Sequence, residues 1–148
     1  MEAINGPILF SLEAEEALCA ALLLHDDLAG LEECEDADLW YDHTRAIVGA
    51  VRVLSGAGKP CGTVFVLALL EPRLDTLAWK GAQGEALILD ILSRHLSDPQ
   101  AWYSRQLGRL IHYYADRRKA MKEAQEAAKL TFSEVMDAAR RRYEGELA

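Results

Sequence analysis

The sequence has 148 residues, of which 16 are Lys or Arg, 24 are Asp or Glu, and 51% are hydrophobic. A chain of this length can bury a core of its own, so we expect one domain that needs no metal or disulfide to fold. The net charge of −8 argues against a dedicated nucleic-acid-binding protein, because such a protein usually presents a basic surface to the phosphate backbone.

The cysteines and the apolar segments exclude further classes. The three cysteines, at positions 19, 34 and 61, are an odd number without CxxC spacing, which favours reduced thiols over a disulfide framework or a zinc site. The longest apolar stretches, residues 17–24 and 64–70, are shorter than the roughly 18 residues of a membrane span. The first residues lack the basic region of a signal peptide. We therefore expect a soluble cytoplasmic protein that does not enter a membrane.

The first sixty residues predict two helices joined by an acidic segment. Ser11 precedes apolar residues spaced as on one helix face, so we expect an amphipathic helix over 11–25 with Ser11 as its N-cap. A short acidic helix or turn follows over 27–36. Asp42 is the expected N-cap of a helix that reaches residue 54 and ends at the glycine-rich turn 55–60.

Two more helices complete the predicted head. Residues 63–70 are apolar with a β-branched start, but no second strand-like segment is present to pair with them, so we expect a helix that Pro72 stops. Gly84 precedes the next helix, which is expected over 85–95.

A long helix is predicted after residue 98, because Asp98 suits the N-cap and Pro99 suits the first helical position. Near its end, residues 131–134 fit the S/T-x-x-E capping box of a new helix, which predicts a helical hairpin. No Gly or Pro marks a turn near residue 130, so one continuous helix over 99–145 is the alternative. The predicted fold class is all-α, with a globular helical head over 1–97 followed by a long helix and a C-terminal helical hairpin in 98–148.

No catalytic or metal-binding constellation is recognisable. The turn Gly56-Ala57-Gly58-Lys59-Pro60 lacks the first glycine and the final hydroxyl residue of a phosphate loop, since those positions hold Val53 and Pro60. The acidic run over 32–38 is typical of a solvated face. We expect no enzyme activity, no cofactor and no metal. A small helical enzyme that uses His112 and Asp116, four residues apart, is the alternative, although an exposed polar pair is the commoner meaning of this spacing.

The C-terminal part of the chain has a different character. Residues 1–100 contain 17 acidic and 6 basic side chains, whereas residues 101–148 contain 7 acidic and 10 basic ones and are rich in helix-forming residues. Arginines and aromatic residues are the usual anchors of protein interfaces, so we rank a partner-binding surface ahead of a solvated face or a nucleic-acid site. The candidate partner-binding residues are Tyr103, Arg109, Tyr113, Arg117, Met136, Arg140, Arg141 and Tyr143.

Residues 11–24, SLEAEEALCAALLL, closely resemble the opening S-[IL]-E-A-E-x-x-[VL]-L-G-x-[LM]-[LM]-L of the amino-terminal domain of DnaB-family replicative helicases. Further similarities follow in order: residues 38–41 look like D-F-Y, and residues 45–48 look like H-R-x-I-F. Residues 58–71 resemble G-x-P-[IV]-D-x-[IV]-T-[LV] and the following L-x-x, and residues 103–126 match the Y-A-x-I-V-R-E-K-A helix in character. The chain departs from the pattern at Thr44, Gly62 and Gln83, so it is identified as a divergent member or an isolated domain.

The resemblance implies a non-catalytic assembly and docking domain that acts in DNA replication, within the primosome. It implies dimers formed through the helical hairpin, a possible hexamer built as a trimer of dimers, and docking of the primase C-terminal domain. Contact with DNA would be weak or indirect. The ATPase motor of the family is absent from this sequence. The alternatives are a free-standing phage or mobile-element domain that modulates a helicase, and the helicase-binding domain of a primase, which has a similar fold.

Overall fold

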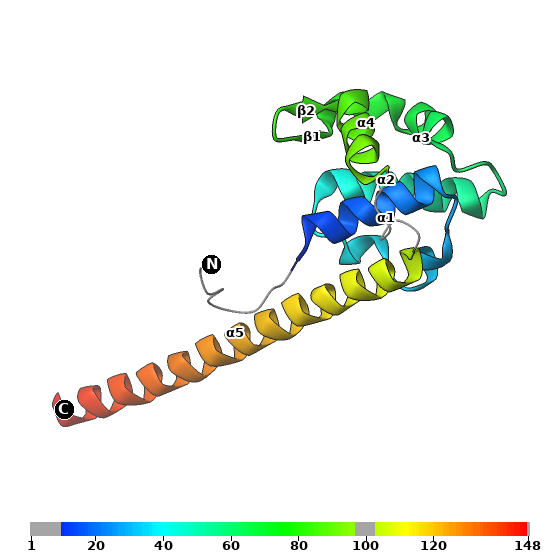
Figure 1. Ribbon diagram of the computed structural model, residues 1–148. Helices are drawn as coiled ribbons and strands as arrows, with labels where there is room; N and C mark the ends of the chain where they lie inside the picture. The colour runs from blue at the N-terminus through cyan, green and yellow to red at the C-terminus, as the bar shows by residue number, and fades with distance from the viewer. Residues whose placement is uncertain (1–9, 97–102, 148) are drawn as a thin grey trace, which may run out of the picture. The chain divides into compact units, whose positions relative to one another are not determined.

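The computed structural model describes residues 10–96 and 103–147, and the chain forms two compact units, Met1–Ala115 and Asp116–Ala148. Unit 1 is the helical head together with the first turns of the last helix, and unit 2 is the remainder of that helix (Figure 1). The predicted all-α fold class is confirmed. Within the described residues, no helix combines the length and the apolar character needed to cross a membrane.

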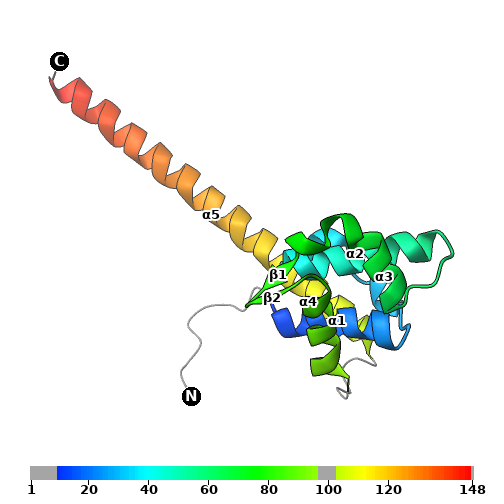
Figure 2. The same cartoon turned by 90° about the horizontal axis from the view of Figure 1, so that it is seen from above.

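The first helix, α1 (Leu12–Leu24), begins where the sequence predicts. The Ser11 hydroxyl accepts a hydrogen bond from Ala14 N at 3.1 Å and so acts as the N-cap. The prediction that this helix is amphipathic is wrong, because every residue from Ala14 to Leu23 is buried. The physical reason is its central position: α1 contacts both α2 (Asp42–Gly56) and α4 (Gly84–His95), and Figure 2 shows α4 crossing it.

A buried carboxylate of α1 caps the next helix. Asp42 was the expected N-cap of α2, and this is wrong, since Asp42 is the first helical residue and Tyr41 occupies the cap without a side-chain hydrogen bond. Instead, Glu15 accepts hydrogen bonds from Trp40 N, Tyr41 N and Thr44 Oγ1, at 3.0, 3.2 and 2.6 Å. A negative charge at a helix N-terminus is favourable, so Glu15 performs the capping from 26 residues away.

The adjacent carboxylate joins α1 to α4. Arg94 donates to both oxygens of Glu16, at 2.8 and 2.9 Å, and His43 Nε2 lies 3.5 Å from Glu16 Oε2. The Glu16 side chain is 1% exposed. Burial alone would raise the pKa of Glu16, but the neighbouring His43 and Arg94 lower it to about 2. Glu16 is therefore a structural anion, and α4 is fixed to α1 through it.

The acidic segment after α1 forms two 3-10 turns, η1 (Ala29–Glu32) and η2 (Asp36–Asp38), in agreement with the predicted short helix or turn. Its carboxylates are not simply a solvated face, which corrects the expectation. Asp36 Oδ1 accepts from Arg52 Nε at 2.9 Å, and the Arg52 guanidinium also donates to the carbonyls of Leu31 and Cys34. The Arg52 side chain of α2 therefore binds both a carboxylate and the backbone of this turn.

The apolar segment is a helix, α3 (Thr63–Leu70), as predicted, and Pro72 lies in the following 3-10 turn η3 (Glu71–Thr76). The sequence did not predict the small β-hairpin that comes next, β1 (Ala78–Trp79) and β2 (Ala82–Gln83), in which Ala78 pairs with Gln83. Its turn residues Lys80 and Gly81 both have positive φ, 48° and 84°, as the two-residue turns of β-hairpins require. The β-hairpin leads directly into α4 (Figure 1).

The last helix, α5, runs without interruption over Ser104–Leu147. The predicted helical hairpin is therefore wrong for the described residues, and the continuous-helix alternative is confirmed over them. Thr131 does not act as a cap, because its hydroxyl donates to the Ala127 carbonyl at 3.0 Å within the helix. The proposed start at Asp98 and Pro99 lies outside the described residues.

The three cysteines are free and buried, as expected of reduced thiols. Cys19 Sγ donates to the Thr44 carbonyl at 3.8 Å, and Cys61 Sγ donates to the Val51 carbonyl at 3.7 Å. Burial raises the pKa of Cys34 to about 11 and raises the pKa of Cys19 well above its usual value. All three thiols belong to unit 1.

Candidate protein-interaction surface

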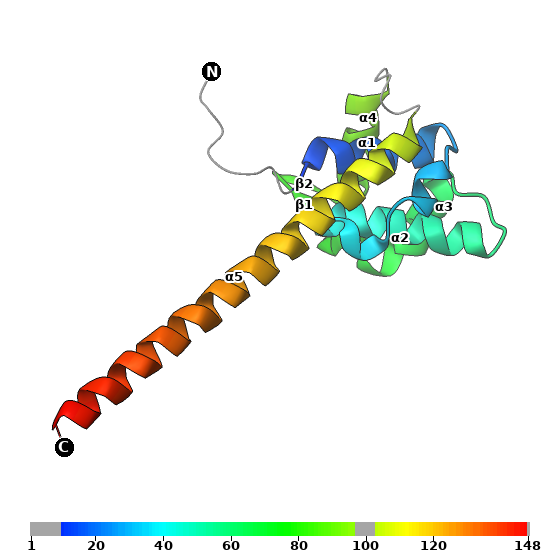
Figure 3. The ribbon, with the colours of Figure 1, turned by 90° about the horizontal axis from the view of Figure 1, so that it is seen from below.

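The first turns of α5 are fixed to the rest of unit 1 where Gly108 meets Gly30, a contact that we call the glycine crossing. Gly30 N donates to Ser104 Oγ at 2.9 Å, and Ser104 N donates to Asp27 Oδ2 at 3.1 Å. A Cβ on Gly108 would lie 2.5 Å from the Gly30 carbonyl oxygen, so only glycine allows this approach. Figure 3 shows these turns of α5, in yellow, beside the turns that follow α1. The glycine crossing thus positions residues 104–112.

Opposite charges reinforce the glycine crossing. Glu33 lies 3.8 Å from Arg105 Nε and 3.3 Å from Arg109 Nε, so the predicted partner-binding residue Arg109 forms an ion pair within unit 1. His112 Nδ1 is hydrogen-bonded to Asp38 Oδ2 at 2.9 Å. The His112 side chain that the sequence paired with Asp116 thus contacts the acidic turn of the head.

The same part of α5 has a buried and an exposed face. Leu107 and Ile111 are buried in the core. The predicted partner-binding residues Tyr103 and Tyr113 are exposed, and Tyr103 lines a shallow, largely apolar pocket of about 310 Å³ with Gln106, Leu107 and Leu110. The exposed face therefore offers aromatic and aliphatic contact area on a rigid support.

Unit 2 exposes an apolar stripe along one face of its helix. No side chain described between residues 116 and 145 is buried, and Phe132, Val135 and Tyr143 are 67%, 61% and 62% exposed. Successive members of the stripe are three or four residues apart, which places them on one helix face. The α5 stripe consists of Met121, Ala124, Ala128, Phe132, Val135, Ala139 and Tyr143.

The other predicted residues of unit 2 lie around this stripe. Met136 is exposed at its edge, and Arg117 is exposed on the same side of the helix, whereas Arg141 is exposed on the opposite side. Arg140 lies between these two sides and pairs with Asp137 at 3.2 Å. Phe132 was not among the predicted interaction residues, because it lies in the segment that fits a capping box. Its spacing of three or four residues from Ala128 and Val135 is the signal that could have identified it.

The glycine-rich turn over 55–60 does not have the arrangement of a phosphate loop. Gly56 ends α2, and Gly58, at φ 70°, lies in the turn where Lys59 N donates back to the Leu54 carbonyl at 2.9 Å. A phosphate loop would instead lead into a helix N-terminus. Among the residues that the structure describes, no three His, Cys, Asp or Glu side chains are grouped to hold a metal ion.

The fold is similar to that of a solved protein domain. The crystal structure of the N-terminal domain of DnaB helicase from Mycobacterium tuberculosis matches with a TM-score of 0.72, over 84% of this chain and 86% of that chain, at 20% sequence identity. No protein-family model matches the sequence, and the search of curated proteins gives no match. The resemblance to the DnaB amino-terminal domain is thus confirmed at the level of the fold.

Proposed function

We propose that this chain is a non-catalytic assembly and docking domain of a DnaB-type replicative helicase, acting in the cytoplasm in DNA replication through protein contacts. The observation that carries the proposal is the exposed α5 stripe on a chain that shares the fold of a DnaB N-terminal domain. The division into a head, 1–97, and an extension, 98–148, belongs to the same proposal. The head provides the rigid support, and the extension provides the contact surface.

Self-association through α5 is the first part of this function. Unit 2 is a helix about 48 Å long at about 1.5 Å per residue, and its stripe leaves large apolar side chains in water. Burying one such side chain stabilises a complex by about 1.5–3 kcal/mol, and a second copy of the helix offers a complementary apolar stripe. A dimer through α5 is therefore the basic assembly, and a trimer of such dimers is the form that the family resemblance implies.

Docking of the primase C-terminal domain is the second part. Tyr103, directly before α5, is exposed, as are Arg117, Arg141 and Tyr143 on α5, and residues of these types are frequent anchors in interfaces. Direct DNA binding is not part of the proposal, because the chain carries a net charge of −8.

Measurement of molar mass against concentration tests the assembly. We expect the wild-type chain to form dimers or larger species, and the double variant F132S/V135S to dissociate at concentrations at least tenfold higher. L130S is the matched control, because Leu130 is 63% exposed on the opposite side of the same helix. A wild-type chain that stays monomeric at all concentrations, or an equal effect of L130S, would refute assembly through the stripe.

The docking partner needs a separate measurement. Titration of the chain with a primase C-terminal domain should shift backbone amide signals of α5 in NMR spectra, and substitution of Arg117 or Arg141 by Ala should weaken binding. Shifts confined to the head would place the primase site elsewhere. A response to a metal ion or to a nucleotide, with no response to primase, would favour an enzyme instead.

A further inference from the structure

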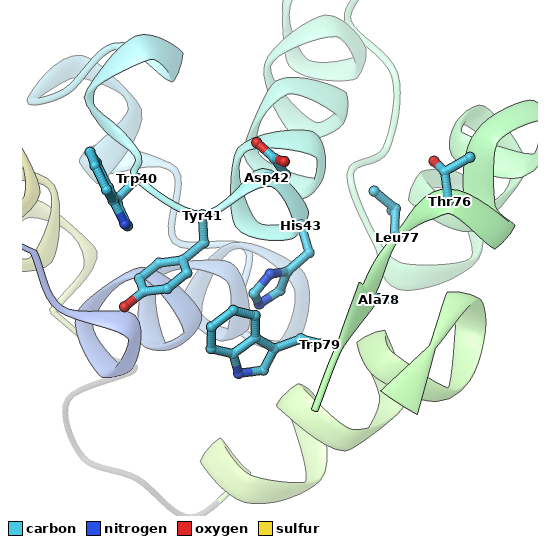
Figure 4. Close-up of a pocket in the computed structure, with 8 residues that line it drawn as sticks. All are labelled: Trp40, Tyr41, Asp42, His43, Thr76, Leu77, Ala78 and Trp79. Atoms are coloured by element: carbon cyan, nitrogen blue, oxygen red, sulfur yellow. The ribbon is translucent and has the colours of Figure 1, made fainter. Parts of the chain in front are cut away.

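A pocket of unit 1 lies between the N-terminal turn of α2 and strand β1 (Figure 4). Its volume is about 470 Å³. Two short stretches of chain line it, residues 40–43 on one side and residues 76–79 on the other. None of these residues belongs to α5, so the pocket is separate from the surface proposed above.

Three rings gather on one side of the pocket. The edge of Tyr41 contacts Trp79 at a centroid distance of 5.1 Å, and His43 stacks on Trp79 at 5.5 Å with an interplanar angle of 23°. Figure 4 shows these rings together, with the Asp42 carboxylate on the other side of the helix turn. The pocket thus combines an aromatic wall with a carboxylate at its edge.

This environment favours a cation. Lys80 Nζ already lies 5.8 Å from the centroid of the Trp79 ring, within the range of cation–π attraction. Residues 1–115 contain 17 acidic and 8 basic side chains. Burial and the charges of Glu15 and Glu16 raise the pKa of Tyr41. The electrostatic potential of these two carboxylates at the aromatic wall is therefore negative.

The Asp42 carboxylate of the pocket remains able to bind a ligand. The His43 ring is 3% exposed and its Nε2 faces Glu16 Oε2 at 3.5 Å, so His43 contributes an aromatic face to the pocket and no hydrogen-bonding atom. Asp42 Oδ1 accepts from Arg45 at 3.2 Å, but the side chain is 94% exposed and a carboxylate accepts several hydrogen bonds. A donor that enters the pocket can therefore reach Asp42.

We propose that this pocket binds an arginine side chain from a basic segment of a partner protein. A guanidinium group is planar, so it stacks on the aromatic wall while its N–H groups donate to the Asp42 carboxylate. Lysine fits less well, because its ammonium group neither stacks nor donates in a planar fork.

NMR titration of the full chain with the peptide Ac-Gly-Arg-Arg-Arg-Gly-NH2 tests the proposal. We expect saturable shifts of the Trp79 indole N–H and of the amides over 40–43 and 76–79. The same peptide with citrulline in place of arginine has no charge and should cause no saturable shift. D42N should weaken binding about fivefold, whereas E71Q, which removes one exposed charge outside the pocket, should leave the affinity within about twofold.

Several outcomes would overturn the proposal. These are the absence of saturable shifts, equal shifts with the citrulline peptide, equal weakening by D42N and E71Q, or shifts confined to other parts of the chain. W79F retains a ring and should bind, so weak binding by W79L together with normal binding by W79F would identify the aromatic wall. These results do not depend on self-association or on primase binding, which concern α5.

Discussion

Two adjacent carboxylates of α1 stabilise unit 1 in different ways. Glu15 accepts hydrogen bonds from the start of α2, and Glu16 pairs with Arg94 of α4. Apolar spacing placed both residues in the helix predicted over 11–25 but could not show that they are buried, because their partners are distant in the sequence. Glu15, the last residue of the S-x-E-A-E segment that carries the family resemblance, therefore caps α2.

The depressed pKa of Glu16 predicts how stability depends on pH. Because the folded-state pKa is about 2 and the ordinary value is 4.5, the stabilisation is complete above pH 4.5 and is lost as the pH falls towards 2. Its size is on the order of 3 kcal/mol, the upper limit that this shift allows. Urea unfolding of the wild type and of E16Q at pH 7 and pH 3 should show a smaller pH dependence in E16Q. An equal dependence in both proteins would contradict this role.

At the scale of the element, the continuity of α5 shows how a local signal can mislead. Residues 131–134 satisfy the capping-box pattern, yet the Thr131 hydroxyl bonds to Ala127 inside the helix. Without a Gly or Pro, the backbone has no reason to leave the helical conformation there. The β-hairpin was missed for a related reason, since strands of two residues are too short to show a periodic pattern.

Two glycines of α5 should respond in opposite ways to alanine. G108A should destabilise unit 1 by about 1–3 kcal/mol, because the added Cβ meets the backbone of Gly30. G145A has open space around its Cβ and should stabilise the helix by up to about 1 kcal/mol through helix propensity. Chemical denaturation of both variants tests the comparison. An equal change in stability in the two variants would show that the contact between Gly30 and Gly108 does not require glycine.

At the scale of the whole molecule, the chain has one unit with a buried core and one unit whose described side chains are exposed or partly exposed. The head helices and the fold class were predictable from apolar spacing, capping residues and the family resemblance. The ion pairs of the acidic turn and the aromatic pocket were not, because they join segments up to 76 residues apart. The candidate partner-binding residues were chosen by type, and the structure adds that several of them lie beside one stripe.

Helix content should therefore depend on protein concentration. A helix that gains little burial within its own chain is only marginally stable, so partner contacts should stabilise unit 2. Circular dichroism at 222 nm should show a loss of helix on dilution of the wild type. The F132S/V135S variant should lose helix already at concentrations about tenfold higher than the wild type does. Constant helix content in both proteins would show that unit 2 needs no partner to remain folded.

The burial of the three thiols has a practical consequence for the chemistry of the chain. Thiol-modifying reagents attack the thiolate, and burial disfavours the thiolate at Cys19, Cys34 and Cys61 alike. Alkylation therefore has to wait for unit 1 to open. Cys19 lies in α1, Cys34 lies just before η2, and Cys61 lies just before α3. The alkylation rate of each cysteine should therefore report how often its own part of the core opens.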